Sequence, residues 1–235
     1  MDKLEEVLRE YQDKKFLVIE PGGNNGDRLI YMGLEKKLKE LRIKYTVFRY
    51  EEKPKFHFLN ILYFGLWKRA LCIVAMLGMF NDSLELAINK IDRWIYEQTL
   101  RAKQIKANPS YVILIHGGAN INDLWGHGIR LLKNVIKYNP KNVIIVGPQT
   151  YWFRETCFQK LFRTTKQKIY LFCRERYSYN LLRSMSLPEN VHIYLPHDTA
   201  FYLSEEDFQP RHDIYDLICI RTDKESNFIF ERQEI

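Results

Sequence analysis

The sequence has few cysteines, and none is placed where a disulfide framework or a zinc site would need it. The four are Cys72, Cys157, Cys173 and Cys219, and no two of them form a CxxC pair. Cys173 and Cys219 fall inside apolar runs that predict strands, where an unpaired cysteine is usually a small core residue. This pattern argues against a disulfide-rich secreted domain or a zinc finger, and it fits a reducing cytoplasm.

Signals for export and for spanning a membrane are also missing. The N-terminal stretch MDKLEEVLRE is charged and acidic, so we expect no secretory signal. Residues 58–80 are very apolar, but Lys68 and Arg69 divide them into halves too short to span a bilayer. Two interpretations stay open: an apolar insertion packed in the core, or a surface that enters the membrane interface through Trp67, Lys68 and Arg69. We expect a cytoplasmic protein, with contact at the inner face of the membrane as the alternative.

Positive charge is present but dispersed along the chain. There are 36 lysines and arginines against 29 aspartates and glutamates, which gives a formal net charge of +7. Such a field suits phosphorylated small molecules or an anionic membrane surface. Because the sequence has no recognition helix, zinc spacing or arginine-rich arm, we do not expect nucleic acid as a partner.

The main architectural feature is an alternation of short apolar runs with helical stretches. Unbroken apolar runs are typical of strands that are covered on both faces. Alternating strands and helices predict an α/β fold with a parallel, Rossmann-like sheet. We expect this domain to occupy residues 1–208, with 58–80 as an insertion, and residues 209–235 to be a linker and the first strand of a second, truncated α/β domain. The predicted strands are 15–20, 45–50, 111–115, 142–146, 168–172, 191–195 and 216–221, and two of the predicted helices are 29–41 and 81–105.

Glycine and polar residues follow five of these strands directly. Ligands of parallel sheets collect at the carboxyl ends of the strands. Five polar corners at one edge are hard to explain by packing alone, so we expect the functional site there. The corners are residues 21–28 (PGGNNGDR), 116–125 (HGGANINDLW), 147–149 (GPQ), 174–176 (RER) and 196–198 (PHD).

The first corner is a candidate phosphate-binding loop. Gly22, Gly23 and Gly26 would let backbone N–H groups approach an anion at a helix N-terminus. The dinucleotide fingerprint fits poorly, because Pro21 takes the place of its first glycine. A tight turn in which Asp27 caps the next helix is the other interpretation.

The second corner begins with Gly117 and Gly118, which let the chain turn away from the sheet. Asn120, Asn122 and Asp123 then offer polar side chains to a cleft. The same residue types also cap helices through Asx turns, so either role is open for each of them.

The last corners carry charge. Arg174 can bind a carboxylate or a phosphate through two parallel hydrogen bonds, or it can form a structural ion pair with Asp198 or Glu175. His116 and His197 are candidates for proton carriers near neutral pH, and structural roles are the alternative.

Taken in order, the corner segments resemble the polysaccharide pyruvyl transferase family. The resemblance implies two Rossmann-like halves that face each other across a cleft, as in GT-B glycosyltransferases, with this chain supplying the N-terminal half. The matching segments are 22–27 (GGNNGD), 116–125, 147–149, 174–178 (RERYS) and 195–201 (LPHDTAF), while 221–225 (RTDKE) resembles the link into the second half.

The resemblance also implies a reaction and its partners. A pyruvyl group would pass from phosphoenolpyruvate to two hydroxyls of a sugar in an exopolysaccharide or cell-surface glycan, giving a ketal. The acceptor could be free or attached to a lipid carrier. Phosphoenolpyruvate is the donor substrate, and we expect neither a cofactor nor a metal. The donor's methylene carbon must receive a proton and the attacking hydroxyl must lose one, so the reaction needs an acid and a base.

These requirements suggest residue roles. We expect Arg174 to bind the donor, Asp27 or Asp123 to contact the acceptor hydroxyls, and Asp198 or His197 to transfer protons. The expected substrate-binding residues are Gly22, Gly23, Asn24, Gly26, Gly117, Gly118, Asn120, Asp123, Gln149, Glu175, Ser178 and Arg221.

Two other functions stay open at this point. One is a GT-B glycosyltransferase that uses a nucleotide sugar, with the same glycine corners serving a different donor. The other is a short, non-catalytic relative that binds a glycan or a partner protein.

Overall fold

The computed structural model describes residues 2–50, 105–122, 127–152, 155–163 and 165–208. The chain divides into two units, residues 1–203 and 204–235. Within the second unit, the described element is a short 3-10 helix, η3 (Glu205–Asp207). The predicted insertion at 58–80, the helix at 81–105 and the strand at 216–221 lie outside the described residues, so the predicted domain boundary at 208 remains a prediction.

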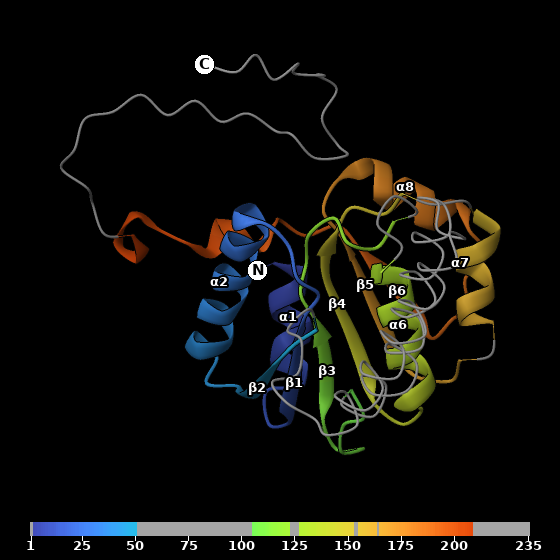
Figure 1. The fold of residues 1–235 in the computed structure, drawn as a ribbon, viewed down its shortest axis with the longest axis horizontal. Coiled ribbons are helices and arrows are strands. Elements are labelled where there is room, and N and C mark those ends of the chain that lie inside the picture. Colours follow the sequence, from blue (N-terminus) through green and yellow to red (C-terminus); the bar gives the residue numbers. More distant parts are fainter. Residues whose placement is uncertain (1, 51–104, 123–126, 153–154, 164, 209–235) are drawn as a thin grey trace, which may run out of the picture. The chain divides into compact units, whose positions relative to one another are not determined.

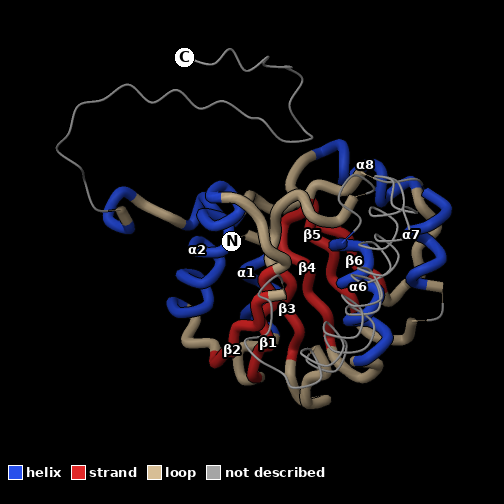
Figure 2. Tube along the Cα trace, in the orientation of Figure 1, coloured by secondary structure: helices blue, strands red, loops and turns tan. Residues whose placement is uncertain are grey.

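The first unit is built on a parallel sheet of six described strands in the order β2-β1-β3-β4-β5-β6 (Figure 2). All six strands predicted before residue 200 are present, and β4 extends past its predicted end to Gln149. The strands are β1 (Lys15–Glu20), β2 (Lys44–Arg49), β3 (Val112–Ile115), β4 (Val143–Gln149), β5 (Ile169–Cys173) and β6 (Val191–Tyr194).

Helices cover both faces of this sheet (Figure 1). Alternate strand residues point to opposite faces, so Leu114 packs with α1 and α2, while Ile113 and Ile115 pack with α6, α7 and α8. This three-layer arrangement confirms the predicted Rossmann-like α/β fold. The helices are α1 (Lys3–Glu10), α2 (Asn25–Glu40), α6 (His127–Tyr138), α7 (Glu155–Phe162), α8 (Arg176–Ser184) and the 3-10 helix η2 (Thr199–Tyr202).

Helix α1 was not among the predicted elements. Asp2 caps it by accepting a hydrogen bond from the N–H of Leu4, which is the usual role of an aspartate before a helix. Leu4, Val7 and Leu8 lie on one face and are buried against the sheet. The acidic N-terminal stretch is therefore an amphipathic helix that completes the core.

The segment after β6 returns across the molecule to α2. Strand β6 forms one edge of the sheet, whereas α2 follows β1 near the other edge. The hydroxyl of Thr199 donates to the carbonyl of Ile30 at 2.8 Å. A Cβ atom at Gly33 would lie 1.9 Å from the Thr199 carbonyl oxygen, so glycine is needed for the two backbones to meet.

Among the described residues, no helix combines the length and the apolar character that crossing a bilayer would require.

Candidate functional site

The loops after β1 and β3 occupy the switch point of the sheet. Strand β1 lies between β2 and β3, so the connections that leave β1 and β3 turn to opposite sides. In sheets of this order the crevice between two such loops is the usual ligand site. Residues 21–24 and 116–122 make up these two loops, which lie where the sequence predicted the site.

The glycine loop after β1 is held by side chains of its own helix. Asn24 caps α2 by accepting hydrogen bonds from the N–H groups of Gly26 at 2.8 Å and Asp27 at 3.3 Å. The Asp27 carboxylate accepts from the Asn24 N–H at 2.9 Å, which completes a capping box. An anion would therefore compete with Asn24 and Asp27 for these N–H groups. The predicted turn is present, but the prediction that Asp27 caps the helix is wrong: Asn24 is the cap, and Asp27 lies inside the helix as its capping-box partner.

Gly118 brings the second corner against the first. Its φ of 133° is in a region that residues other than glycine rarely adopt. A Cβ atom there would lie 2.8 Å from Asp27 Oδ1 and 3.0 Å from Asn120 Nδ2. The side chains of Asp27 and Asn120 therefore both lie against Gly118. No group in the described part of the chain hydrogen-bonds to the buried amide nitrogen of Asn120.

Gln149 ties the end of β4 to the second corner. Its side-chain nitrogen donates to the His116 carbonyl at 2.8 Å, and its side-chain oxygen accepts from the Asn120 N–H at 3.1 Å. The residue is fully buried. The sequence predicted Gln149 as a substrate ligand, but both ends of its amide hold the loop that carries Asn120. We therefore regard it as a positioning residue.

Arg174 and Asp198 form an ion pair at the ends of β5 and β6. The distance between Arg174 Nε and Asp198 Oδ2 is 2.6 Å. The other carboxylate oxygen accepts from the N–H of Ala200 at 2.9 Å and so caps η2. The Arg174 side chain is 41% exposed and that of Asp198 is 10% exposed. The arginine therefore keeps contact with solvent, while the aspartate is almost covered.

Ser178, in the first turn of α8, is turned away from solvent. Its hydroxyl oxygen accepts from the Tyr151 N–H at 2.7 Å, and its hydroxyl donates to the Glu175 carboxylate. Ser178 is fully buried, so it holds the loop after β4 in place. His197 is exposed, and its ring lies edge-on to Phe201 with 6.4 Å between centroids.

Contacts connect the corners into one row along the carboxyl edge. Asp27 meets Gly118, which bridges to Gln149, and the Gln149 carbonyl accepts from the Arg174 N–H at 2.9 Å. Arg174 then pairs with Asp198. The predicted site residues Asp123 and Arg221 lie outside the described residues.

His116 points beneath this row, toward α2. Its ring is fully buried and packs against the ring of Tyr31 with centroids 4.3 Å apart. Burial lowers the pKa of His116 to about 3. The hypothesis that His116 carries protons near neutral pH therefore finds no support in its surroundings.

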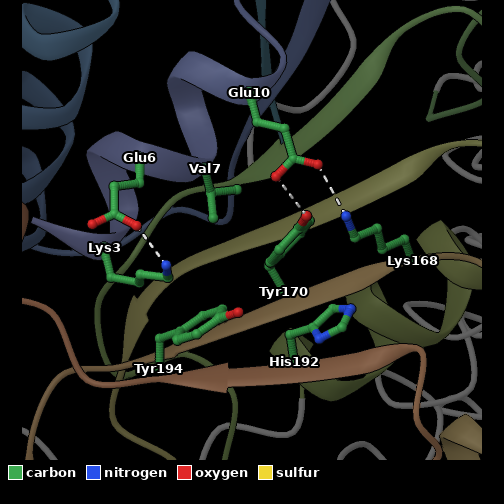
Figure 3. Close-up of a pocket in the computed structure, with 8 residues that line it drawn as sticks. All are labelled: Lys3, Glu6, Val7, Glu10, Lys168, Tyr170, His192 and Tyr194. Atoms are coloured by element: carbon green, nitrogen blue, oxygen red, sulfur yellow. Dashed lines mark hydrogen bonds and ion pairs between the residues drawn. The ribbon is translucent and has the colours of Figure 1, made fainter.

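A hollow lies between α1 and the strands β5 and β6 (Figure 3). Glu10 accepts from the Tyr170 hydroxyl at 3.1 Å and from the Lys168 amine at 3.0 Å, and Lys3 pairs with Glu6. The two lysines of this hollow are balanced by its two glutamates, so the hollow offers an anionic donor no surplus positive charge. It measures about 260 Å³ and is lined by Lys3, Glu6, Val7, Glu10, Lys168, Tyr170, His192 and Tyr194.

This hollow was not among the sites predicted from the sequence. His192 and Tyr194 alternate along β6, opposite Tyr170 and Phe172 of β5, which is the pattern of side chains that share one face. With α1 recognised as a helix, that alternation would have pointed to the hollow.

One solved structure with a similar fold is a functionally uncharacterised protein from Klebsiella pneumoniae subsp. pneumoniae NTUH-K2044. It shares 18% sequence identity, with a TM-score of 0.56, and the match covers 95% of this chain. The chain spans 65% of the length of that protein. No functionally curated protein shows significant sequence similarity to the chain.

The comparison with protein families supports the resemblance carried by the corner segments. The sequence model for polysaccharide pyruvyl transferases matches residues 24–233, which include four complete corners and most of the first. The chain therefore belongs to the polysaccharide pyruvyl transferase family.

Proposed function

We propose that the protein transfers a pyruvyl group from phosphoenolpyruvate to two hydroxyls of a sugar in an exopolysaccharide or cell-surface glycan. Membership of the family implies a transferase. The observation that carries the finer proposal is Arg174, a partly exposed arginine in the row of polar residues, beside a nearly buried aspartate. An arginine fork matches the carboxylate and the phosphate of this donor.

The proposed chemistry assigns one task to each charged group. A proton reaches the methylene carbon of phosphoenolpyruvate, and a sugar hydroxyl bonds to the adjacent carbon as it loses its own proton. The second hydroxyl then displaces phosphate from that carbon, and its proton leaves with the phosphate or through a base. Asp198 or His197 handles the protons, and Asp27 or Asp123 holds the acceptor hydroxyls. No cofactor takes part in this scheme.

Asp27 is placed well for contact with a sugar. Its carboxylate lies against Gly118 and is only partly buried, so a sugar hydroxyl could donate a hydrogen bond to it. Gly118 leaves room for this approach because it has no side chain. The acceptor would be free or lipid-linked. The proposed setting is the cytoplasm, at the inner face of the membrane when the acceptor is lipid-linked.

Phosphate release tests the proposal directly. The full chain is incubated with phosphoenolpyruvate and candidate acceptor glycans, and the product is checked for ketal by mass spectrometry. Arg174→Ala should abolish turnover, whereas the matched control Arg183→Ala, an exposed arginine late in α8, should keep it. Ketal formation that survives Arg174→Ala would remove the donor assignment.

The same assay separates the competing functions. Release of nucleotide from a nucleotide sugar, with no ketal from phosphoenolpyruvate, would favour a GT-B type glycosyltransferase. Binding of glycan without turnover of either donor would favour a non-catalytic relative.

A further inference from the structure

Three side chains that could ligate a metal converge between the sheet and α2. Glu20 ends β1, Glu35 lies on α2, and His116 directly follows β3. One ligand atom from each lies within 4.8 Å of those of the other two. A tetrahedral Zn²⁺ ion with bonds of 2.0–2.2 Å holds its ligand atoms about 3.4 Å apart. Small rotamer changes would therefore suffice to bring the three atoms onto one ion.

His116 is the second, independent observation. The residue is fully buried, and neither ring nitrogen has a hydrogen-bond partner among the described residues. A buried polar group without a partner costs free energy, so such a ring is rarely left without something to bind. The ring faces the two carboxylates, and Tyr31 packs against it at 4.3 Å and limits its rotation.

The carboxylates are oriented by groups outside the cluster. Tyr45 donates its hydroxyl hydrogen to Glu35 at 3.3 Å, and Arg49 Nε pairs with Glu20 Oε2 at 3.0 Å. Hydrogen bonds of this kind fix ligand orientation in metal sites. Arg49 is 59% exposed, so it can stay on one oxygen of Glu20 while the other oxygen turns to an ion.

We propose that Glu20, Glu35 and His116 bind one divalent transition-metal ion of the Zn²⁺ type. Imidazole nitrogen with two carboxylate oxygens suits Zn²⁺ better than Mg²⁺ or Ca²⁺, which prefer oxygen ligands alone. Two carboxylates also match the charge of a divalent ion. The proposal does not depend on pyruvyl transfer, because the cluster lies beneath the polar row and not within it.

The role we assign to this ion is structural. Glu20 immediately precedes the loop with Gly22 and Gly23, and His116 immediately precedes Gly117 and Gly118. An ion held by both would join the ends of β1 and β3 to α2. It would thereby fix the two loops at the switch point of the sheet.

The test uses the full chain after removal of metals with a chelator. Zn²⁺ is added, its affinity is measured by calorimetry, and the melting temperature is followed. Wild-type protein should bind one equivalent and melt at a higher temperature. In Glu35→Gln the amide oxygen can still accept from Tyr45, so the fold should persist while Zn²⁺ affinity falls at least about tenfold. Mg²⁺ should have no effect on the melting temperature.

Glu10→Gln is the matched control, since Glu10 belongs to the separate hollow beside α1. This variant should bind Zn²⁺ as the wild type does. Loss of binding in Glu10→Gln but not in Glu35→Gln would place the ion in that hollow and overturn the proposal. X-ray absorption of the Zn²⁺-loaded protein should show one imidazole ligand. A spectrum without imidazole, or no Zn²⁺ binding by the wild type, would also overturn it.

Discussion

Arg174 Nε lies 2.6 Å from Asp198 Oδ2, so the arginine that we assign to the donor already holds a carboxylate of the protein. The two residues come from the ends of neighbouring strands, β5 and β6. A donor carboxylate or phosphate must either share the guanidinium with Asp198 or replace it. Asp198 therefore lowers the affinity of Arg174 for anions while it keeps the side chain in position.

Asp198→Asn should separate these two effects. Asparagine can still accept from the Ala200 N–H and cap η2, but it removes the charge that competes for Arg174. Phosphoenolpyruvate should bind up to about fivefold more tightly, which corresponds to an exposed ion pair worth up to about 1 kcal/mol. Calorimetry measures this change, with Arg174→Ala as the variant that should not bind. Weaker binding by Asp198→Asn would mean that Asp198 itself contacts the donor.

Gln149→Leu should destabilise the protein without a change in side-chain size. The leucine cannot accept from the Asn120 N–H or donate to the His116 carbonyl, so two buried backbone groups lose a partner. We expect a loss of about 2–4 kcal/mol in the free energy of unfolding. Urea denaturation monitored by circular dichroism measures it. A loss below about 1 kcal/mol would argue that Gln149 is free to turn toward a ligand.

Gly33→Ala should loosen the contact between α2 and η2. The added methyl group would lie 1.9 Å from the Thr199 carbonyl oxygen, and a backbone atom cannot yield as a flexible side chain can. Overpacking of this kind costs about 1–3 kcal/mol. Thermal unfolding should show the loss, and Met32→Ala, at a partly exposed position on the same helix, should cost less. An unchanged melting temperature for Gly33→Ala would contradict the close packing.

Acid should destabilise the protein through His116. Burial lowers the pKa of His116 from 6.5 to about 3. Between these two pH values the histidine is protonated in the unfolded chain but stays neutral in the folded chain. The free energy of unfolding is therefore unaffected by this group above pH 6.5 and decreases as the pH falls toward 3. The decrease is at most about 1.4 kcal/mol per pH unit.

Urea denaturation in the presence of a chelator, between about pH 7 and pH 5, measures this dependence. His116→Gln should show a shallower fall in unfolding free energy than the wild type, because glutamine does not titrate. Equal slopes in the two proteins would assign the acid sensitivity to other groups.

The sequence predicted the sheet well because its strands are short and buried on both faces. Ile113 and Leu114 are both fully buried although they face opposite layers, so an apolar run without alternation marked β3 correctly. Helix α1 was not predicted because its charged residues outnumber its apolar ones. Only Leu4, Val7 and Leu8 reveal the face that packs on the sheet.

The sequence predicted where a candidate site lies but not the role of each residue, and the site itself stays a prediction. Polar residues after parallel strands predict where a site lies, and Asp27, Gly118, Arg174 and Asp198 do meet there. The sequence could not show that both ends of the Gln149 amide are already hydrogen-bonded. Its partners are backbone groups of the loop after β3, and only the folded chain brings them to Gln149.

The cluster around His116 is a different case. Its members come from a strand end, the middle of a helix and a second strand end. No spacing rule connects these three positions, so only the packing of α2 on the sheet reveals them.

The return of the chain from β6 to α2 also determines where the ends of the first unit lie. Tyr202 donates its hydroxyl hydrogen to Asp2, so the last turn of the unit is attached to its first residues. The contact between Tyr202 and Asp2 therefore joins η2 to the start of α1, although 200 positions separate them in the sequence.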